Sequence, residues 1–147
     1  MRIPEFLFPI INRVMKMLLA SPAHGLFSGS VMTIYFSGRK TGRARSTPVR
    51  YMRKDTTTVT CLTGRQTRWW QNFLSPAEVQ LQIAGRRVAA VAHSTPDDRA
   101  RIEAALKETL DRFPGDAPYH GLTRSPTPEA FAAAVANDVI VTFTLRA

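Results

Sequence analysis

The strongest constraint on the fold is an alternation of apolar and polar residues in the second half of the chain. Between residues 78 and 83 every second residue is apolar, and the same period of two returns between residues 138 and 146. In the first of these segments the apolar residues are Val79, Leu81 and Ile83. A period of two places these side chains on one face of a strand and the polar ones on the other. The pattern therefore predicts strands with one solvated face.

Similar patterns predict about six strands in all. They cover residues 31–37, 45–53, 57–63, 78–84, 86–94 and 138–146. Ala84-Gly85 leaves room only for a tight hairpin, and Gly38 with Gly42 marks an earlier turn. Strands with such short connections must be mainly antiparallel. Six short strands with helices at the edges predict the α+β class and a small closed or partly closed barrel.

Three helices are predicted between the strands, over residues 68–74, 96–113 and 128–137. For the second, Thr95 is the expected N-cap, with Pro96 in the first turn. The segment 114–128 is rich in Pro, Gly and Ser, which predicts either a lid over a pocket or an ordered connection.

Composition indicates one basic globular domain with an anionic partner. The chain has 147 residues, with 20 Lys and Arg against 11 Asp and Glu, a net charge of +9. The single cysteine, Cys61, cannot form an internal disulfide, which favours a reducing compartment. We predict no metal site, because Cys61, His24, His93 and His120 do not have metal-ligand spacing. Cys61 and the three histidines are expected to be structural or surface residues.

The positive charge is concentrated in one stretch. No acidic residue lies between Glu5 and Asp55, where nine basic residues occur, and the rest of the chain has eleven of each sign. Seven of the nine lie between Arg39 and Lys54. We predict a single anion-facing surface there. Its glycine turn exposes backbone N–H groups to phosphate or carboxylate, although the spacing is not that of a P-loop.

Residues 1–20 are predicted to form a separate amphipathic helix, followed by the domain at residues 21–147. Its apolar face is wide, and Arg13 and Lys16 interrupt the apolar run too early for a membrane span. One interpretation is a helix lying in the plane of an anionic membrane surface. The other is a helix packed on its own domain or on a dimer partner.

Three motifs in order carry a family resemblance. The run G-R-K-T-G-x-x-R-x-x-P spans residues 38–48, R-W-W-Q-N-F spans residues 68–73, and a strand follows at residues 79–83. Together they resemble the deazaflavin (F420)-dependent nitroreductase family, which has a split β-barrel, flavin-binding-like fold. The resemblance covers roughly residues 21–146. It implies that the chain binds coenzyme F420, a deazaflavin with a phosphodiester and an oligoglutamate tail. FMN is the alternative cofactor, but its single phosphate would leave most of the cations unused.

The resemblance also implies the site residues. Arg39, Lys40 and Arg45 would hold the anionic tail, and the backbone of Thr47, Pro48 and Val49 would lie along the ring. The rest of the cofactor wall would be formed by Leu62, Thr63, Arg68, Trp69 and Asn72. Adjacent helical residues point in different directions, so one of Trp69 and Trp70 is expected to be core. Apart from the resemblance, the chemistry of hydride transfer calls for a final proton, and Tyr119 or a water is the candidate donor.

The implied activity is hydride transfer from the reduced deazaflavin to a small conjugated acceptor, such as an enone, a quinone or an unsaturated lipid-like compound. Residues 63–67 are shorter than the corresponding loop of the better-known nitroreductases, which argues against nitro compounds. Residues 21–28 resemble a membrane-associated branch of the family, so a non-catalytic carrier of a fatty-acid-like ligand is the alternative. Nucleic-acid binding lacks a supporting motif.

The protein is expected in the cytoplasm, with peripheral contact to the inner membrane face. Its expected oligomeric state is a monomer or a homodimer.

Overall fold

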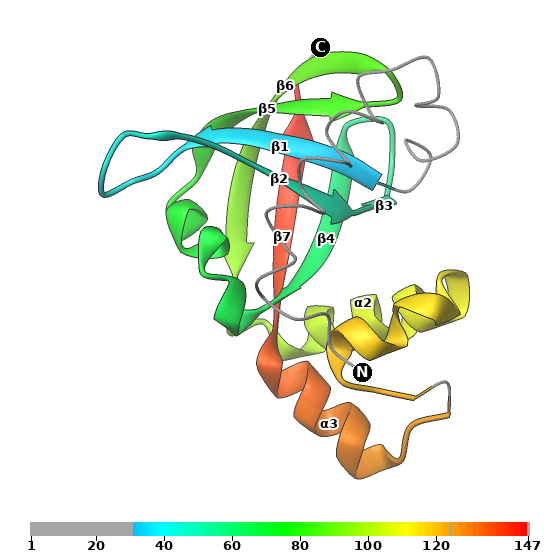
Figure 1. Ribbon diagram of the computed structural model, residues 1–147. Helices are drawn as coiled ribbons and strands as arrows, with labels where there is room; N and C mark the ends of the chain where they lie inside the picture. The colour runs from blue at the N-terminus through cyan, green and yellow to red at the C-terminus, as the bar shows by residue number, and fades with distance from the viewer. Residues whose placement is uncertain (1–30, 124, 147) are drawn as a thin grey trace.

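The computed structural model describes residues 31–123 and 125–146, and its centre is one seven-stranded sheet (Figure 1). The strands are β1 (Val31–Ser37), β2 (Ala44–Arg50), β3 (Met52–Arg53), β4 (Thr58–Gly64), β5 (Ala77–Ile83), β6 (Arg86–Thr95) and β7 (Asp138–Leu145). Their order is β2-β1-β5-β6-β7-β4-β3, and every neighbouring pair is antiparallel. The predicted antiparallel, α+β architecture is confirmed.

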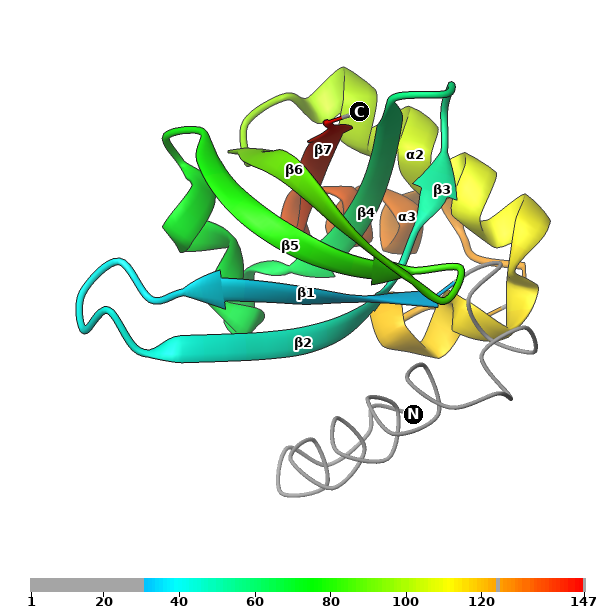
Figure 2. The ribbon, with the colours of Figure 1, turned by 90° about the horizontal axis from the view of Figure 1, so that it is seen from above.

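The sheet curls because its two edge strands belong to one stretch of chain. β2 pairs with β1 and β3 pairs with β4, yet only Tyr51 separates β2 from β3. The single strand predicted over residues 45–53 is therefore divided at Tyr51, whose buried side chain joins the core. The stretch passes from one edge of the sheet to the other, which brings the edges toward each other (Figure 2).

Backbone conformation at the hairpins follows the glycine positions. Ala84 and Gly85 have φ of 51° and 77°, the pair of positive angles that a two-residue type I′ turn requires. Gly42, with φ of 68°, closes the β1–β2 hairpin, where its N–H donates to the carbonyl of Gly38. The two predicted turns are confirmed.

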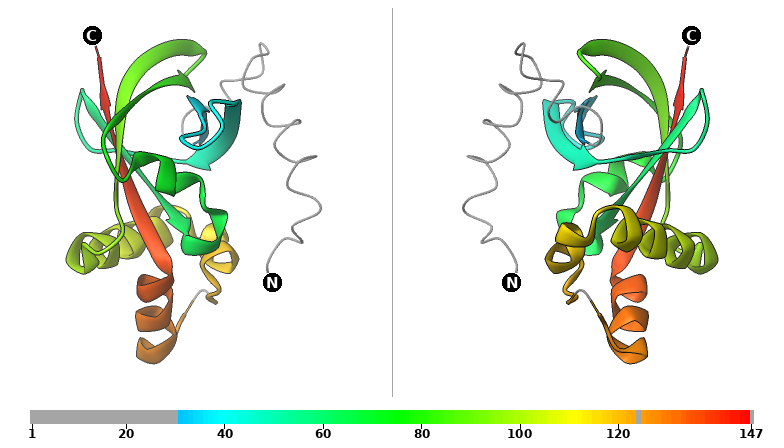
Figure 3. Two further views of the ribbon diagram at one scale, coloured as in Figure 1. Left: turned by 90° about the vertical axis from the view of Figure 1, so that its left-hand side faces the viewer. Right: turned by 90° about the vertical axis from the view of Figure 1, so that its right-hand side faces the viewer.

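Two apolar clusters lie on opposite faces of the curled sheet. The inner cluster includes Met32, Leu81 and Phe143, all fully buried. The outer cluster packs α2 (Arg99–Arg112), the 3-10 helix η5 (Pro114–His120) and α3 (Pro128–Asn137) against β4 and β7. These helices gather at one end of the barrel (Figure 3). Burial raises the pKa of Cys61 and confirms it as a small core residue of the inner cluster.

Two helix predictions need correction. α2 is capped by Asp98, whose side chain accepts a hydrogen bond from the N–H of Arg101, whereas Thr95 is the last residue of β6. Pairing of Thr95 with Ile140 of β7 extends the strand past the predicted cap. The segment predicted as a helix over residues 68–74 is a 3-10 helix, η4 (Trp69–Phe73).

Residues 1–20 lie outside the described residues, and so does His24. Within residues 31–123 and 125–146, no helix is both long enough and apolar enough to cross a membrane.

Candidate functional site

The glycine-basic turn is tied to η4 by one asparagine. The N–H of Arg39 donates to Oδ1 of Asn72 at 2.7 Å, and Nδ2 of Asn72 donates to the carbonyl of Trp69 at 2.8 Å. These bonds join segments that are 33 positions apart in the sequence. Two sets of residues that the sequence assigned to the cofactor site thus meet in space, with Asn72 as the link.

An aromatic cluster packs next to this junction. Phe73 is 1% exposed, and its ring makes edge contacts with two other rings. The distance between ring centroids is 5.3 Å to Phe36 and 6.1 Å to Trp69. Trp70 is also buried, and its indole N–H donates to the carbonyl of Arg65 at 3.0 Å. The expectation that one of the two tryptophans is core is confirmed for Trp70. Trp69 is half-buried and keeps part of its surface outside the core.

Four cations remain at the tip of the β1–β2 hairpin: Arg39, Lys40, Arg43 and Arg45. All four are exposed, and none forms an ion pair with an acidic residue within the described part of the chain. Gly38 is buried beneath them, and a Cβ added there would lie 3.6 Å from Nε of Arg45. The tip is therefore a compact, unneutralised positive surface suited to an anion with several charges.

Other cations of the same stretch are neutralised within the domain. Arg50 forms an ion pair with Asp116 of η5, and Lys54 forms one with Glu108 of α2. The hydrogen bond from Lys54 lowers the pKa of Glu108 below its ordinary value. The expected single anion-facing surface is therefore wrong for Arg50 and Lys54, because acidic groups from much later in the sequence fold against them.

The central residues of β2 lie at an edge of the sheet. Thr47 pairs with Ile34 and Val49 with Met32, so both face the inner side of the barrel. β2 pairs only with β1, which suits Pro48 because its missing N–H removes no bond to a second neighbour. All three residues are half-buried.

Residues around the end of β4 divide between the two sides of the sheet. Thr63 is buried, with its hydroxyl 2.8 Å from that of Thr67, whereas Leu62 packs against the outer, helical cluster. Arg68 is exposed with φ of 62° between η3 (Arg65–Thr67) and η4. The structure therefore brings Trp69 and Asn72 to the basic turn, but turns the side chain of Leu62 away from the inner face of the barrel.

Tyr119 lies apart from the basic turn, on η5. Its side chain is 57% exposed. Partial burial raises its pKa, the nearby Asp116 carboxylate raises it further, and Arg50 lowers it. The net shift is upward, so the phenol carries its proton at neutral pH. Within the connector predicted as either a lid or an ordered segment, residues 114–120 form the 3-10 helix η5.

Sequence reasoning missed a buried pair between His120 and Asp138. Nδ1 of His120 lies 2.8 Å from Oδ2 of Asp138, and the two side chains are 9% and 1% exposed. Neither motif nor spacing links residues 18 positions apart in this way, so the sequence held no signal for the pair. Within the described residues, no three His, Cys, Asp or Glu side chains are grouped to hold a metal ion.

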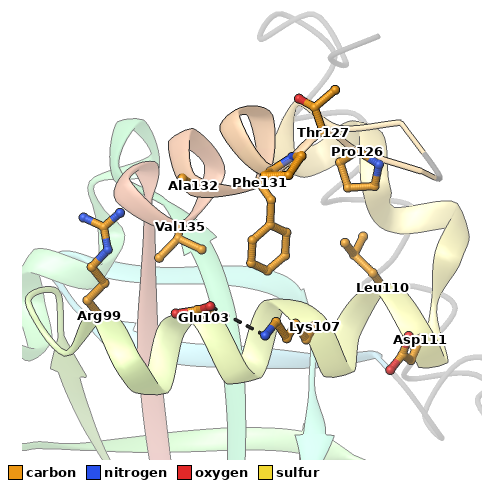
Figure 4. A pocket seen from close by; sticks show the side chains of 11 residues that line it. Arg99, Glu103, Lys107, Leu110, Asp111, Pro126, Thr127, Phe131, Ala132 and Val135 are labelled. Atoms are coloured by element: carbon orange, nitrogen blue, oxygen red, sulfur yellow. Dashed lines mark ion pairs between the residues drawn. The ribbon is translucent and has the colours of Figure 1, made fainter.

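The surface formed by residues 31–123 and 125–146 includes a small hollow and a larger groove. A small one of about 330 Å³ adjoins Arg45 at the end of the β1–β2 hairpin and is also lined by Phe36 and Val79. A larger groove of about 710 Å³ runs between α2 and α3 (Figure 4). Leu110, Phe131 and Val135 are among its apolar lining residues, and the Lys107–Glu103 ion pair lies along it.

Comparisons with known proteins give a family match and a set of structures with the same fold. A family model described as F420H(2)-dependent quinone reductase matches residues 15–116. No curated protein sequence matches.

Three solved structures share the fold at low sequence identity. A Group A Streptococcus HupZ variant is 13% identical with a TM-score of 0.54, over 88% of this chain and 96% of its own. A general stress FMN/FAD binding protein from Xanthomonas citri is 12% identical with a TM-score of 0.52, over 92% and 85%. A protein described as a domain-swapped dimer is 15% identical with a TM-score of 0.51, over 91% and 94%. At these identities the likeness concerns the fold alone.

Proposed function

Because the chain belongs to the F420H(2)-dependent quinone reductase family, we propose that it is an oxidoreductase that uses reduced coenzyme F420 to reduce a quinone. Its curled antiparallel sheet confirms the split β-barrel, flavin-binding-like fold. The observation in the structure that carries the proposal is the hairpin tip, where four cations have no acidic partner among the described residues.

The residues at the hairpin tip fit the anionic tail of this cofactor. Arg39, Lys40 and Arg45 would bind its phosphodiester and carboxylates through charge-assisted hydrogen bonds. Trp69 and the backbone of β2 at Thr47, Pro48 and Val49 would then border the ring. FMN remains the alternative cofactor, but one phosphate would leave most of the four cations unsatisfied.

Quinone reduction needs a hydride and a proton. The bound, reduced deazaflavin supplies the hydride. The protein has to hold the two reactants at contact distance and to exclude water from between them. We propose that Tyr119 donates a proton to a quinone oxygen, since its phenol is protonated at neutral pH. Hydride and proton together convert the quinone to the hydroquinone.

A non-catalytic carrier of an apolar, fatty-acid-like ligand is the second candidate function. The groove between α2 and α3 favours it, because Leu110, Phe131 and Val135 offer apolar side chains there.

For the reductase, enones and unsaturated lipid-like compounds remain further candidate hydride acceptors. A homodimer and a monomer are both proposed, and sedimentation velocity can distinguish them.

We expect the purified protein to oxidise reduced F420 when a soluble quinone is added. The measurement is the return of oxidised deazaflavin absorbance, with enone and nitro acceptors assayed beside the quinone and a protein-free reaction as control. Turnover with the quinone supports the reductase. Tight F420 binding without turnover of any acceptor would instead favour the carrier.

We further propose that residues 1–20 attach the protein peripherally to an anionic membrane surface on the cytoplasmic side. Each basic residue near such a surface contributes ~1 kcal/mol, and Arg13 and Lys16 lie in this segment. Full-length protein should co-sediment with anionic vesicles and be released by salt, whereas protein lacking residues 1–20 should stay in solution. Equal sedimentation of both forms would favour packing of the segment on the protein itself.

A further inference from the structure

The short helix η5 is anchored to β2 at its beginning. Arg50 donates to both carboxylate oxygens of Asp116, with Nε at 2.7 Å and Nη2 at 2.9 Å. The same guanidinium lies over the ring of Phe113, 4.3 Å from its centroid. Two parallel hydrogen bonds fix orientation as well as distance. The start of η5 therefore has a defined position relative to β2.

The other end of η5 is anchored to β7. His120 is the last residue of the helix, and its bond to Asp138 is almost fully buried. Behind it, Gly121 adopts φ of 72°, and the N–H of Leu122 donates to the carbonyl of Ala117. η5 contains Pro118, and its N-cap residue Phe113 makes no side-chain cap hydrogen bond. The two tertiary anchors therefore add to the stability that its few local backbone hydrogen bonds provide.

Both anchors adjoin residues assigned to the cofactor site. Arg50 directly follows Val49 of β2, and Asp138 pairs across the sheet with Gly64, which follows Thr63. Tyr119 lies between the two anchors along η5, one residue before His120 and three after Asp116. The helix that carries Tyr119 is thus fixed at both ends, relative to the end of β2 and to the start of β7.

We infer that the Arg50–Asp116 and His120–Asp138 pairs are positioning pairs that hold Tyr119 where it donates its proton. This inference rests on the proposed reductase function. The four residues act through Tyr119 and need not touch the quinone. Loss of His120 would leave the Asp138 carboxylate buried without its hydrogen-bond partner. Because a buried, unpaired charge is costly in free energy, the end of η5 is expected to move.

A double-mutant cycle tests the inference through kcat. Tyr119→Phe should lower kcat on the order of tenfold, below the usual range for a general acid because water reaches this exposed side chain. His120→Ala should cause a similar loss with the F420 dissociation constant unchanged, and should add nothing in the Tyr119→Phe background. His120→Asn, which keeps a donor near the position of Nδ1, should restore most of kcat. Independent, multiplying losses would overturn the inference.

A second measurement needs neither cofactor nor turnover. The protein has three tyrosines, so 3-fluorotyrosine labelling gives few ¹⁹F signals, and the Tyr119→Phe variant assigns that of Tyr119. His120→Ala and the milder Asp116→Asn should both shift or broaden this signal, with the Tyr35 signal as internal control. An unchanged Tyr119 signal in both variants would overturn the positioning role. If the wild type reduces no acceptor while Tyr119 responds, the reductase proposal fails and the positioning of Tyr119 is supported.

Discussion

Replacing Lys40 and Arg45 together by alanine should weaken F420 binding by about 10²- to 10⁴-fold. Each substitution removes one charge-assisted contact worth about 1.5–3 kcal/mol, and each 1.4 kcal/mol corresponds to tenfold in affinity. Either single variant should lose about tenfold to a hundredfold. Fluorescence titration of the cofactor at one fixed ionic strength measures the dissociation constants of the wild type and of the three variants.

Arg86→Ala is the matched control for this experiment. Arg86 is an exposed cation at the start of β6 and lies outside the β1–β2 hairpin, so its removal changes the net charge by the same amount. It should leave the dissociation constant within about twofold of wild type, since separated surface charges are screened by salt. If Lys40→Ala and Arg45→Ala behave like Arg86→Ala, the tail does not bind at the hairpin tip.

Phe73→Ala should lower the free energy of unfolding by about 3–5 kcal/mol, as expected for loss of a large aromatic side chain from a core. Phe73 is 1% exposed and contacts the rings of Phe36 and Trp69. η4 carries Asn72, which holds the basic turn, so F420 affinity should fall with stability. Urea denaturation gives the unfolding free energy, and cofactor titration at low temperature gives the affinity of the folded fraction.

Leu74→Ala provides a neighbouring comparison. Leu74 is 46% exposed, so its truncation should change stability by no more than about 0.5 kcal/mol. Equal, small effects of Phe73→Ala and Leu74→Ala would mean that η4 unfolds separately from the barrel and does not support the hairpin tip.

Local features of the sequence determined most of the strand pattern. A period of two identifies a half-buried strand wherever it occurs, so β1, β5 and β6 lie within a residue or so of their predicted bounds. The Ala84-Gly85 turn could also be predicted from neighbouring residues alone. Glycine favours positive φ angles, whatever the distant residues are. The motif at residues 38–48 and the Arg-Trp-Trp motif at residues 68–73 pointed to the family for the same reason: their residues are neighbours in the sequence.

Tertiary structure decided which of those residues work together. Local pattern showed seven cations between Arg39 and Lys54, but Asp116 and Glu108, distant in sequence, neutralise Arg50 and Lys54 and leave the hairpin tip charged. Asn72 reaches Arg39 across 33 positions, and His120 reaches Asp138 across 18. Such contacts depend on how the barrel closes and where the helices pack. Periodicity and spacing describe only neighbours along the chain, so they contain no record of these contacts.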